Sequence, residues 1–363
     1  MELPTADATQ RGHGDAALTH PPESLAQRDR QRWVDRLAKL ANPATVRDAL
    51  KARMYRLEPG HPSSPWNSDG TPRPPLPRLS DVGNPRLTDA QYADHVRTVS
   101  KKLDEARAAG LRTEHQFALG PDHQEWTVDR ATHHRAILDE VWSQAAEVPC
   151  ERKAIIAGGL GGAGKTTVLN EHTAADQGKY LTIDPDKFKE KLAQRGLVPE
   201  VSGLSPMEAS SLAHEESSYL ARQLSLRATA AGKNIIWDIT MSSSSSAGRR
   251  VDELRRASYD RIEGVFVDIP VETSVARTEA RHRRGCDLYL AGQGLGGRIV
   301  PAEVIRAQRD PEFGSVNRRA FESLKDSFDE WTVYDNSQDD RPAILIESSG
   351  EKTSAHPLDE RGR

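Results

Sequence analysis

The chain has 363 residues, enough for about two or three domains, but only 36% of them are hydrophobic and 5% aromatic, so part of the chain is expected to lie outside a packed core. The net charge of -4 excludes a general electrostatic attraction to nucleic acid or to anionic membranes and favours a small molecule as the ligand. The two cysteines, Cys150 and Cys286, are too few and too far apart to suggest a disulfide framework or a metal cluster, and no apolar run is long enough for a membrane span or a secretion signal, so we expect a cytoplasmic location.

The N-terminal part of the chain is expected to be helical in places and partly disordered. Residues 1–22 mix Asp, Gly, His, Pro and Thr without periodicity, which predicts a disordered tail. Apolar residues recur at helical spacing over residues 23–58 and predict a helical segment there. Eight of the 22 prolines lie within residues 59–86, so this stretch is expected to be an extended linker.

Residues 87–150 are expected to form a helical extension that packs on the domain after it. A capping box, apolar positions at helical spacing and a terminal glycine predict a helix over residues 88–109. A second helix is predicted over residues 127–146, where His133 and His134 are adjacent. Neighbours on a helix point about 100° apart and cannot share a metal, so a solvated or partly packed pair is favoured over a metal site.

The most informative stretch is residues 153–168, which reads KAIIAGGLGGAGKTTV: an apolar strand, a glycine-rich loop and the start of a helix. It matches G-x-x-x-x-G-K-[ST], the loop whose backbone N–H groups cradle nucleotide phosphates. Glycines are needed because several N–H groups must point at one anion, which requires backbone angles that a Cβ would strain. Lys165 is expected to reach the β and γ phosphates of ATP, and the Thr166 hydroxyl to coordinate Mg²⁺. The expected ATP-binding residues are Gly159, Leu160, Gly161, Gly162, Ala163, Gly164, Lys165, Thr166 and Thr167.

Two carboxylates follow the next predicted strand, residues 179–183, which ends in Asp184-Pro185-Asp186. Ligands of open parallel sheets bind at the carboxyl ends of the strands, so both carboxylates should lie beside the nucleotide. Asp184 can then serve Mg²⁺, and Asp186 an acceptor hydroxyl. The alternative is an Asx turn that caps a helix over residues 187–195.

Further polar residues follow a third predicted strand, residues 234–237. Asp238, Thr240 and a run of serines up to residue 246 come directly after it. A carboxylate and a hydroxyl at a strand end suit a polar acceptor substrate, whereas the serine run can equally be a loop without a role. The long helix predicted over residues 206–232 carries two adjacent glutamates that, from the pattern alone, are expected to be solvated.

A cationic segment follows the fourth predicted strand, residues 264–269. The helix predicted over residues 271–284 ends in R-H-R-R, and cations near a helix C-terminus complement its dipole. Alternatively, Arg281, the glycine-rich residues 292–297 and Arg298 form a lid that closes cations over transferring phosphates. We favour the lid for at least one arginine.

Strands that alternate with helices predict an α/β fold: a parallel-sheet P-loop kinase domain flanked by helices over residues 151–347, preceded by the helical and partly disordered N-terminal extension. Its last elements are expected to be helices at residues 301–308 and 318–327 and strands at residues 331–334 and 344–347. Residues 348–363 are polar and are expected to be a disordered tail.

With these motifs in place, the chain resembles the zeta-toxin family of P-loop kinases, toxins that phosphorylate UDP-N-acetylglucosamine. The resemblance covers residues 130–335, and the 21 residues from Lys165 to Asp186 match the spacing of the family. It implies that Lys165 is the phosphate-loop lysine, that Asp186 is the general base, and that Arg281 and Arg298 are the lid arginines that grip ATP.

The same resemblance implies the acceptor side of the site. The family's strand-end E-G-T, which holds the amino sugar, corresponds to the segment from Asp238 to Thr240, and a substrate-side helical glutamate corresponds to Glu215 or Glu216. Two departures fall on this side: Asp238 is one methylene shorter than the usual Glu, and Ser242 stands where an arginine often follows.

Three functions therefore stay open. The first is an ATP-dependent kinase of the sugar 3'-hydroxyl of UDP-N-acetylglucosamine, with Mg²⁺ as cofactor and an antitoxin protein as a potential partner. The second is a P-loop kinase of another nucleotide-linked or nucleic-acid hydroxyl, which the altered Asp238 and Ser242 keep open. The third is a nucleotide-binding module without transfer activity, against which Asp186 counts. Neither a membrane nor nucleic acid is the expected partner.

Overall fold

The structure is a computed structural model that describes residues 87–172 and 178–350. The disordered tail, helical segment and linker predicted within residues 1–86 lie outside the described residues, as does the tail from residue 351 onwards. None of the helices in the described ranges is both long and apolar enough to cross a membrane.

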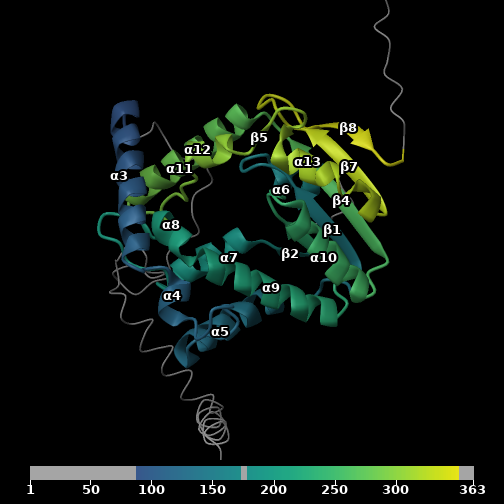
Figure 1. The fold of residues 1–363 in the computed structure, drawn as a ribbon, viewed down its shortest axis with the longest axis horizontal. Helices are drawn as coiled ribbons and strands as arrows, with labels where there is room; N and C mark the ends of the chain where they lie inside the picture. The colour runs from purple at the N-terminus through teal and green to yellow at the C-terminus, as the bar shows by residue number, and fades with distance from the viewer. Residues whose placement is uncertain (1–86, 173–177, 351–363) are drawn as a thin grey trace, which may run out of the picture. The chain divides into compact units, whose positions relative to one another are not determined.

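A six-stranded sheet forms the core of the described part, with strand order β2-β3-β1-β4-β7-β8 (Figure 1). Neighbouring strands are parallel except β8, which runs antiparallel to β7 at the edge. The predicted α/β class is confirmed, with this antiparallel edge strand as an addition. The strands are β1 (Lys153–Gly158), β2 (Leu181–Ile183), β3 (Ile235–Asp238), β4 (Arg261–Asp268), β7 (Glu330–Asp335) and β8 (Ile344–Ser348).

Helices cover both faces of the sheet, which explains why β1 is apolar at consecutive positions. Ala154 and Ile156 belong to the cluster on one face, and Ile155 and Ala157 to the cluster on the other. The first face packs against α5 (Val128–Gln144), α7 (Pro185–Gln194), α9 (His214–Ala230), α10 (Ser244–Arg256) and α13 (Val316–Glu322). The second packs against α6 (Lys165–His172), α11 (Val271–Leu290) and α12 (Ala302–Arg306).

The predicted helix after residue 87 is α3 (Asp89–Ala108), and its capping box of Thr88 and Gln91 is present. Its apolar side, including Val99 and Leu103, packs against Leu212 and Ile299 in a third cluster. This helix therefore contacts segments that are far away in the sequence. The remaining elements are the short helices α4 (Thr113–Phe117) and α8 (Pro206–Ala209), the 3-10 helices η2 (Ser210–Ala213) and η3 (Lys325–Ser327), and the hairpin of β5 (Arg309–Asp310) and β6 (Gly314–Ser315).

Two helices between α8 and α11 were predicted with the wrong bounds. The helix predicted over residues 206–232 is split into α8, η2 and α9, and the Ser210 hydroxyl donates to the Met207 carbonyl at 2.7 Å where the first helix ends. The helix predicted to end at residue 284 continues to Leu290. The R-H-R-R sequence thus lies inside α11, and compensation of a helix end by these cations is excluded.

The serine run after β3 is not a structureless loop. Ser243 caps α10, and its side chain accepts a hydrogen bond from the backbone N–H of Ser246 at 3.3 Å. Serine is a favoured N-cap residue because its hydroxyl accepts from an N–H group that has no partner within the helix. The run therefore begins a helix whose residues 249 and 250 face the cleft described below.

A buried ion cluster joins α5 to α9, and His133 and His134, predicted to be solvated or partly packed, are more deeply packed than that: they are 7% and 3% exposed. Glu216, fully buried, accepts from Arg130 Nε at 2.5 Å and from Arg130 Nη2 at 2.7 Å. Its Oε1 also lies 2.6 Å from His134 Nε2. Burial alone would raise the pKa of Glu216, but the bonds from His134 and Arg130 outweigh it and lower that pKa.

We expect Glu216→Ala to lower the free energy of unfolding by about 3–5 kcal/mol, because it leaves Arg130 as an uncompensated buried charge. Glu215→Ala, at the exposed neighbouring position, is the matched control and should change it by no more than about 0.5 kcal/mol. Denaturant unfolding of both variants measures the difference. Equal effects would mean that the cluster contributes nothing specific.

Candidate active site

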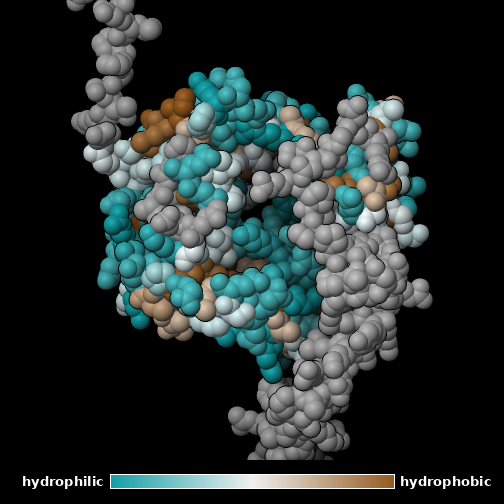
Figure 2. All heavy atoms as spheres, turned by 180° about the vertical axis from the view of Figure 1, so that it is seen from behind, coloured by the Kyte–Doolittle hydropathy of each residue, from teal (hydrophilic) through white to brown (hydrophobic). Residues whose placement is uncertain are grey.

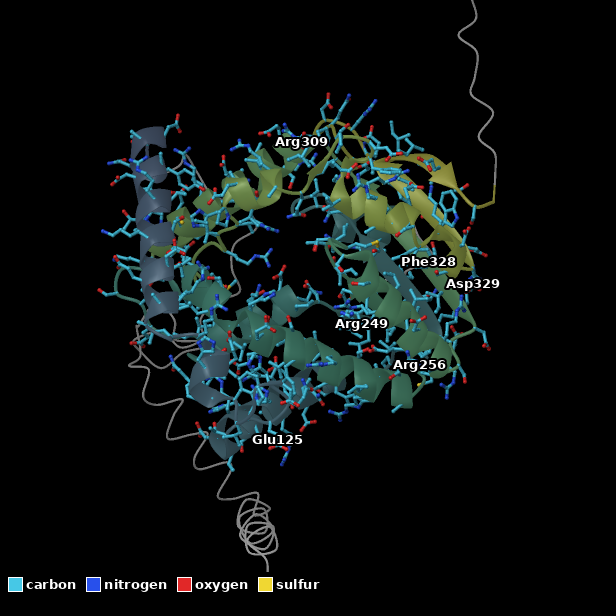
Figure 3. The ribbon with its side chains drawn as sticks, viewed as in Figure 1. Glu125, Arg249, Arg256, Arg309, Phe328 and Asp329 are labelled. Carbon is cyan, nitrogen blue, oxygen red and sulfur yellow. The ribbon has the colours of Figure 1, made fainter. Side chains whose placement is uncertain are left out.

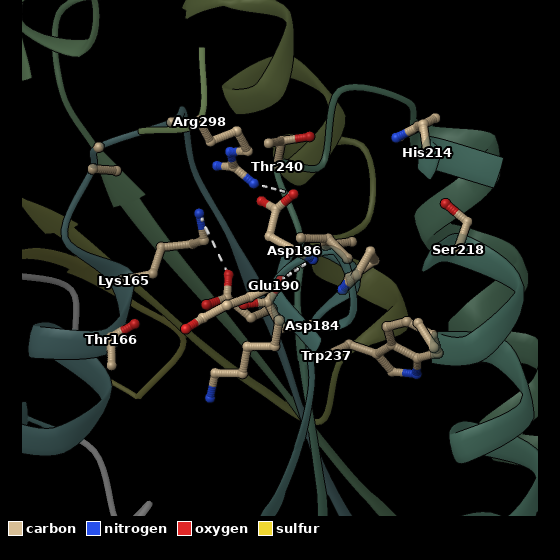
Figure 4. A pocket seen from close by; sticks show the side chains of 18 of the residues that line it. Lys165, Thr166, Asp184, Asp186, Glu190, His214, Ser218, Trp237, Thr240 and Arg298 are labelled. Atoms are coloured by element: carbon tan, nitrogen blue, oxygen red, sulfur yellow. Dashed lines mark hydrogen bonds and ion pairs between the residues drawn. The ribbon is translucent and has the colours of Figure 1, made fainter. Parts of the chain in front are cut away.

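A cleft of about 1600 Å³ opens at the carboxyl ends of β1, β2 and β3 (Figure 4). In the space-filling view from behind, the residues around the central hollow are mainly hydrophilic (Figure 2). Most residues assigned from the sequence line this cleft. They are Gly161, Gly162, Ala163, Gly164, Lys165, Thr166, Thr167, Asp184, Asp186, Glu215, Asp238, Thr240, Arg281 and Arg298.

Three of the assigned residues do not line the cleft. Gly159 and Leu160 are not among the lining residues, and Leu160, 2% exposed, belongs to the apolar cluster on the second face of the sheet. Glu216 is bonded to Arg130 and His134 in the buried ion cluster of α5 and α9. Of the two adjacent glutamates, Glu215 thus stays a candidate substrate ligand, and Glu216 is corrected to a structural residue.

The phosphate loop joins β1 to α6 and needs its glycines for two reasons. Gly159, Gly162 and Gly164 have φ values of 145°, 74° and 85°, a region that L-residues with a Cβ rarely adopt. A Cβ on Gly159 would also lie 2.5 Å from the carbonyl oxygen of Val267, and one on Gly164 would collide with the amide of Asn336. The motif residues therefore adopt a conformation that glycine alone permits.

Three side chains that the sequence did not single out hold this loop from outside. Ser274 Oγ donates to the carbonyl of residue 161 at 2.7 Å, and Arg277 Nη1 to that of residue 162 at 3.3 Å. Asn336 Nδ2 donates to the carbonyl of residue 163 at 2.7 Å. These bonds fix the orientation of three consecutive peptide groups. The donors come from α11 and from the end of β7, so no local motif connects them with the loop.

Lys165 is paired with a carboxylate at the end of the neighbouring strand. Its Nζ lies 3.4 Å from Asp238 Oδ1 and donates to the Gly159 carbonyl at 3.3 Å (Figure 4). The pairing follows from the sheet, because the parallel register sets Ala157 of β1 beside Asp238 of β3.

Asp184 has the geometry of the predicted Asx turn and lines the cleft as well. Its Oδ1 accepts from the Asp186 backbone N–H at 2.8 Å and caps α7. Burial, with the nearby negative charge of Asp238 added, raises the pKa of Asp184 to about 6. Carboxylate oxygens are the donors that Mg²⁺ prefers, and this one is partly buried in the lining of the cleft.

Arg298 reaches across the cleft to Asp186, and the two form an ion pair (Figure 4). Lys189 adds a second cation, with its Nζ 3.2 Å from Asp186 Oδ1. Arg281 lines the same cleft from α11. Arg283 instead donates to Asp89 Oδ1 at 2.7 Å and so binds the start of α3. The two candidate lid arginines therefore share one site, and their neighbour does not.

The cleft also has a cationic wall formed by Arg222 of α9 and Arg249 and Arg250 of α10. Arg249 points into the space between α9 and α10 (Figure 3). The Arg250 guanidinium lies 4.6 Å from the centroid of the Trp237 ring. This cation–π contact orients the guanidinium group. Sequence reasoning missed this wall because its members are on two helices that only the fold brings together.

The turn after β3 is strained where it meets the phosphate loop. Met241, 2% exposed, has a φ of 58°, which is unusual for a residue other than glycine. Asn317 Nδ2 donates to the Thr240 carbonyl at 2.7 Å and helps to hold this conformation. Such strain is characteristic of functional sites.

A mostly parallel sheet with a phosphate loop after one strand and acidic residues at neighbouring strand ends defines the class of P-loop kinases. A family model described as Zeta toxin matches residues 140–340, more than half of the chain. The chain therefore belongs to the zeta toxin family, whose members are kinases.

The solved structures that match the chain have low sequence identity. AvrRxo1-ORF1:-ORF2 with ATP is 18% identical, with a TM-score of 0.48 over 65% of this chain and 76% of that chain. A chain of the PezAT chromosomal toxin-antitoxin system of Streptococcus pneumoniae is 20% identical, with a TM-score of 0.46 over 64% of this chain and 85% of that one. No curated protein sequence matched the chain.

We expect Asp184→Asn to stabilise the nucleotide-free protein in a pH-dependent way. Because the folded-state pKa of Asp184 is raised to about 6, its carboxyl favours folding when protonated, and this contribution is lost as the pH rises through about 6. Asn keeps the capping oxygen but carries no charge. The free energy of unfolding should therefore rise by about 1–3 kcal/mol near pH 8 and by about half as much near pH 5. Unfolding curves at both pH values measure this; a gain that does not depend on pH would contradict it.

Proposed function

We propose that this zeta toxin family protein transfers the γ-phosphoryl group of ATP to the amino-sugar hydroxyl of UDP-N-acetylglucosamine. The observation that carries the proposal is the convergence of the phosphate loop, Asp186, Arg281 and Arg298 on one cleft. Phosphoryl transfer depends on positioning and on neutralising charge, and these are the groups that it requires.

On the donor side, the loop N–H groups bind the phosphates of ATP, and Lys165 exchanges Asp238 for the β and γ phosphates. Arg281 and Arg298 stabilise the charge on the transferring group. Thr166 and Asp184 offer the oxygen donors that would hold Mg²⁺, and their common position in the lining of the cleft supports this assignment. When bound, Mg²⁺ neutralises charge on the phosphates.

On the acceptor side, Asp186 accepts the proton of the sugar hydroxyl while the hydroxyl oxygen attacks the γ-phosphorus. The new O–P bond forms as the bond to the β-phosphate oxygen breaks, and ADP leaves with the electron pair. Asp238 and Thr240, with Glu215, bind the sugar. The arginines of the cationic wall can donate hydrogen bonds to a diphosphate. This supports an acceptor that contains a diphosphate group.

A second candidate is the transfer of phosphate to another nucleotide-linked hydroxyl, such as that of a dinucleotide. The same cationic wall can bind the diphosphate of other nucleotides. Asp238 is also shorter than the glutamate that is usual in the family, which leaves more room for a different acceptor. An antitoxin protein as partner is also a proposal, which rests on membership of the zeta toxin family.

The test is a screen of phosphoryl transfer from γ-labelled ATP onto UDP-sugars, NAD and nucleic-acid ends. We expect the label on UDP-N-acetylglucosamine, with loss of transfer when the 3'-hydroxyl of the sugar is blocked. Label only on a dinucleotide would favour the second candidate. ATP binding without transfer to any acceptor would favour a binding module and overturn both kinase assignments.

Lys165→Ala and Asp186→Ala should both abolish transfer, for different reasons. The first loses the contact to the β and γ phosphates, so ATP affinity falls with turnover. The second loses the proton acceptor, so turnover falls by about 10²–10⁴. It also frees Arg298 from its carboxylate, so ATP affinity stays at least as tight as in the wild type. Equilibrium ATP binding and kcat for both variants separate the two effects, and turnover of Asp186→Ala within a few-fold of the wild type would exclude it as the base.

Arg281→Ala and Arg298→Ala should lower kcat far more than they weaken ATP binding, because an arginine that stabilises a transferring phosphoryl group contributes about 10³–10⁵ to the rate. Arg283→Ala is the matched control on the same helix. Its half-exposed pair with Asp89 is worth no more than about 1 kcal/mol, and turnover should stay nearly unchanged. Equal losses at all three positions would point to a diffuse basic surface and rule out the lid.

A further inference from the structure

Outside the cleft, four metal-binding side chains from three helices converge beside α3. His95 lies on α3, Glu208 on α8, and His282 and Cys286 are one turn apart on α11. One potential ligand atom of each lies within 4.8 Å of the others. Glu208, His282 and Cys286 are 2%, 1% and 5% exposed, and His95 is partly exposed at the surface. The three helices lie next to one another in Figure 1.

We propose that these side chains form a structural zinc site with a Cys-His-His-Glu ligand set. In a tetrahedral zinc site, ligand atoms are about 3.3 Å apart for N and O pairs and about 3.5 Å apart when one is sulfur. Cys286 Sγ lies 3.4 Å from His282 Nε2, 3.5 Å from Glu208 Oε1 and 3.7 Å from His95 Nε2. His282 Nε2 lies 3.2 Å from Glu208 Oε1.

Among the five distances given for these atoms, the one between His95 and Glu208 departs from this geometry. His95 Nε2 lies 2.5 Å from Glu208 Oε1, which is a direct hydrogen bond. An ion bound between the two atoms would replace this bond and increase the distance between them by less than about 1 Å. Because His95 is the most exposed of the four residues, its side chain is the one that can make this movement.

Neighbouring groups orient the ligands as they do in known zinc sites. Tyr92 Oη lies 2.9 Å from His282 Nδ1 and donates to the Glu279 carbonyl at 3.2 Å. With its hydroxyl proton used there, Tyr92 is available to accept from Nδ1–H, which would leave the Nε2 lone pair of His282 for the ion. The Glu208 Oε2 atom accepts from the backbone N–H and the hydroxyl of Ser205 at 2.7 and 2.8 Å, which leaves Oε1 for the ion.

Charge and ligand type also favour zinc. Two neutral imidazoles, one carboxylate and one thiolate balance a divalent cation, and sulfur with imidazole selects zinc over Mg²⁺. In the structure, the Cys286 thiol donates a hydrogen bond to Glu208 Oε1. Zinc binds the thiolate form of cysteine. Zinc binding therefore releases the thiol proton to solvent.

The site adjoins both lid arginines, and this part of the inference rests on the proposed function. His282 directly follows Arg281, and the backbone N–H of Gly297, which precedes Arg298, hydrogen-bonds to the Cys286 sulfur. A Cβ on Gly297 would collide with the His282 carbonyl, so the two segments are in direct contact. Zinc would thus fix the backbone at both arginines and fasten α3 to the kinase core.

The test uses the full chain, stripped with a chelator and titrated with Zn²⁺ or Co²⁺. We expect one equivalent of metal per chain, a rise in Tm of several degrees, and a thiolate-to-cobalt charge-transfer band with the spectrum of a tetrahedral site. Cys286→Ser should abolish the band and weaken zinc binding by more than about 100-fold. The matched controls Cys150→Ser and His115→Gln, at exposed positions, should bind as the wild type does.

Because Cys286 is buried and its variant can fail to fold, His95→Gln serves as the second variant. We expect it to fold and to keep the charge-transfer band with a changed ligand field and at least tenfold weaker zinc binding. A stripped protein that takes up no stoichiometric zinc, or a wild-type affinity in both variants, would overturn the site and leave a buried hydrogen-bond network. These readouts do not involve phosphoryl transfer, so they stand or fall independently of the kinase proposal.

Discussion

The ion pair of Arg298 with Asp186, together with that of Lys165 with Asp238, is the interaction on which the candidate site depends. Each pair joins a cation proposed to bind phosphate to a carboxylate proposed to bind the acceptor. Phosphate oxygens compete with these carboxylates for the same N–H donors, so we expect each cation to leave its carboxylate when a triphosphate binds. We infer that ATP binding and release of the base are coupled: Asp186 becomes available to a hydroxyl when Arg298 turns to the phosphates.

The sheet makes these pairs possible. The parallel register sets Ala157 beside Asp238 and Ile183 beside Trp237, so the ends of β1, β2 and β3 meet along one edge. Helix α11 then serves two purposes. Its first half holds the phosphate loop through Ser274 and Arg277, and its second half carries Arg281 and half of the proposed zinc ligands. The donor side, the lid and the docking of α3 are thus connected by one helix.

Features encoded in short stretches could be predicted from the sequence, and features made by tertiary contacts could not. The phosphate loop, the D-P-D turn and the strands β1 to β4 are local patterns, and all were predicted. The end of α11 was not, because Gly285 is held in the helix by close packing against Gly297. The burial of Glu216 likewise depends on Arg130, which is 86 residues away. Two distant cysteines argue against a metal site in the sequence, and the zinc site proposed at Cys286 could not be predicted because its other ligands are histidines and a glutamate on separate helices.

The most direct measurement is a crystal structure of the chain with a non-hydrolysable ATP analogue. We expect the triphosphate to lie in the loop from Gly159 to Thr166, with Lys165 and Arg298 turned from their carboxylates to phosphate oxygens and Asp186 facing the acceptor half of the cleft. A nucleotide bound away from the loop, or one bound there while Arg298 stays on Asp186, would contradict the coupling of donor binding to release of the base.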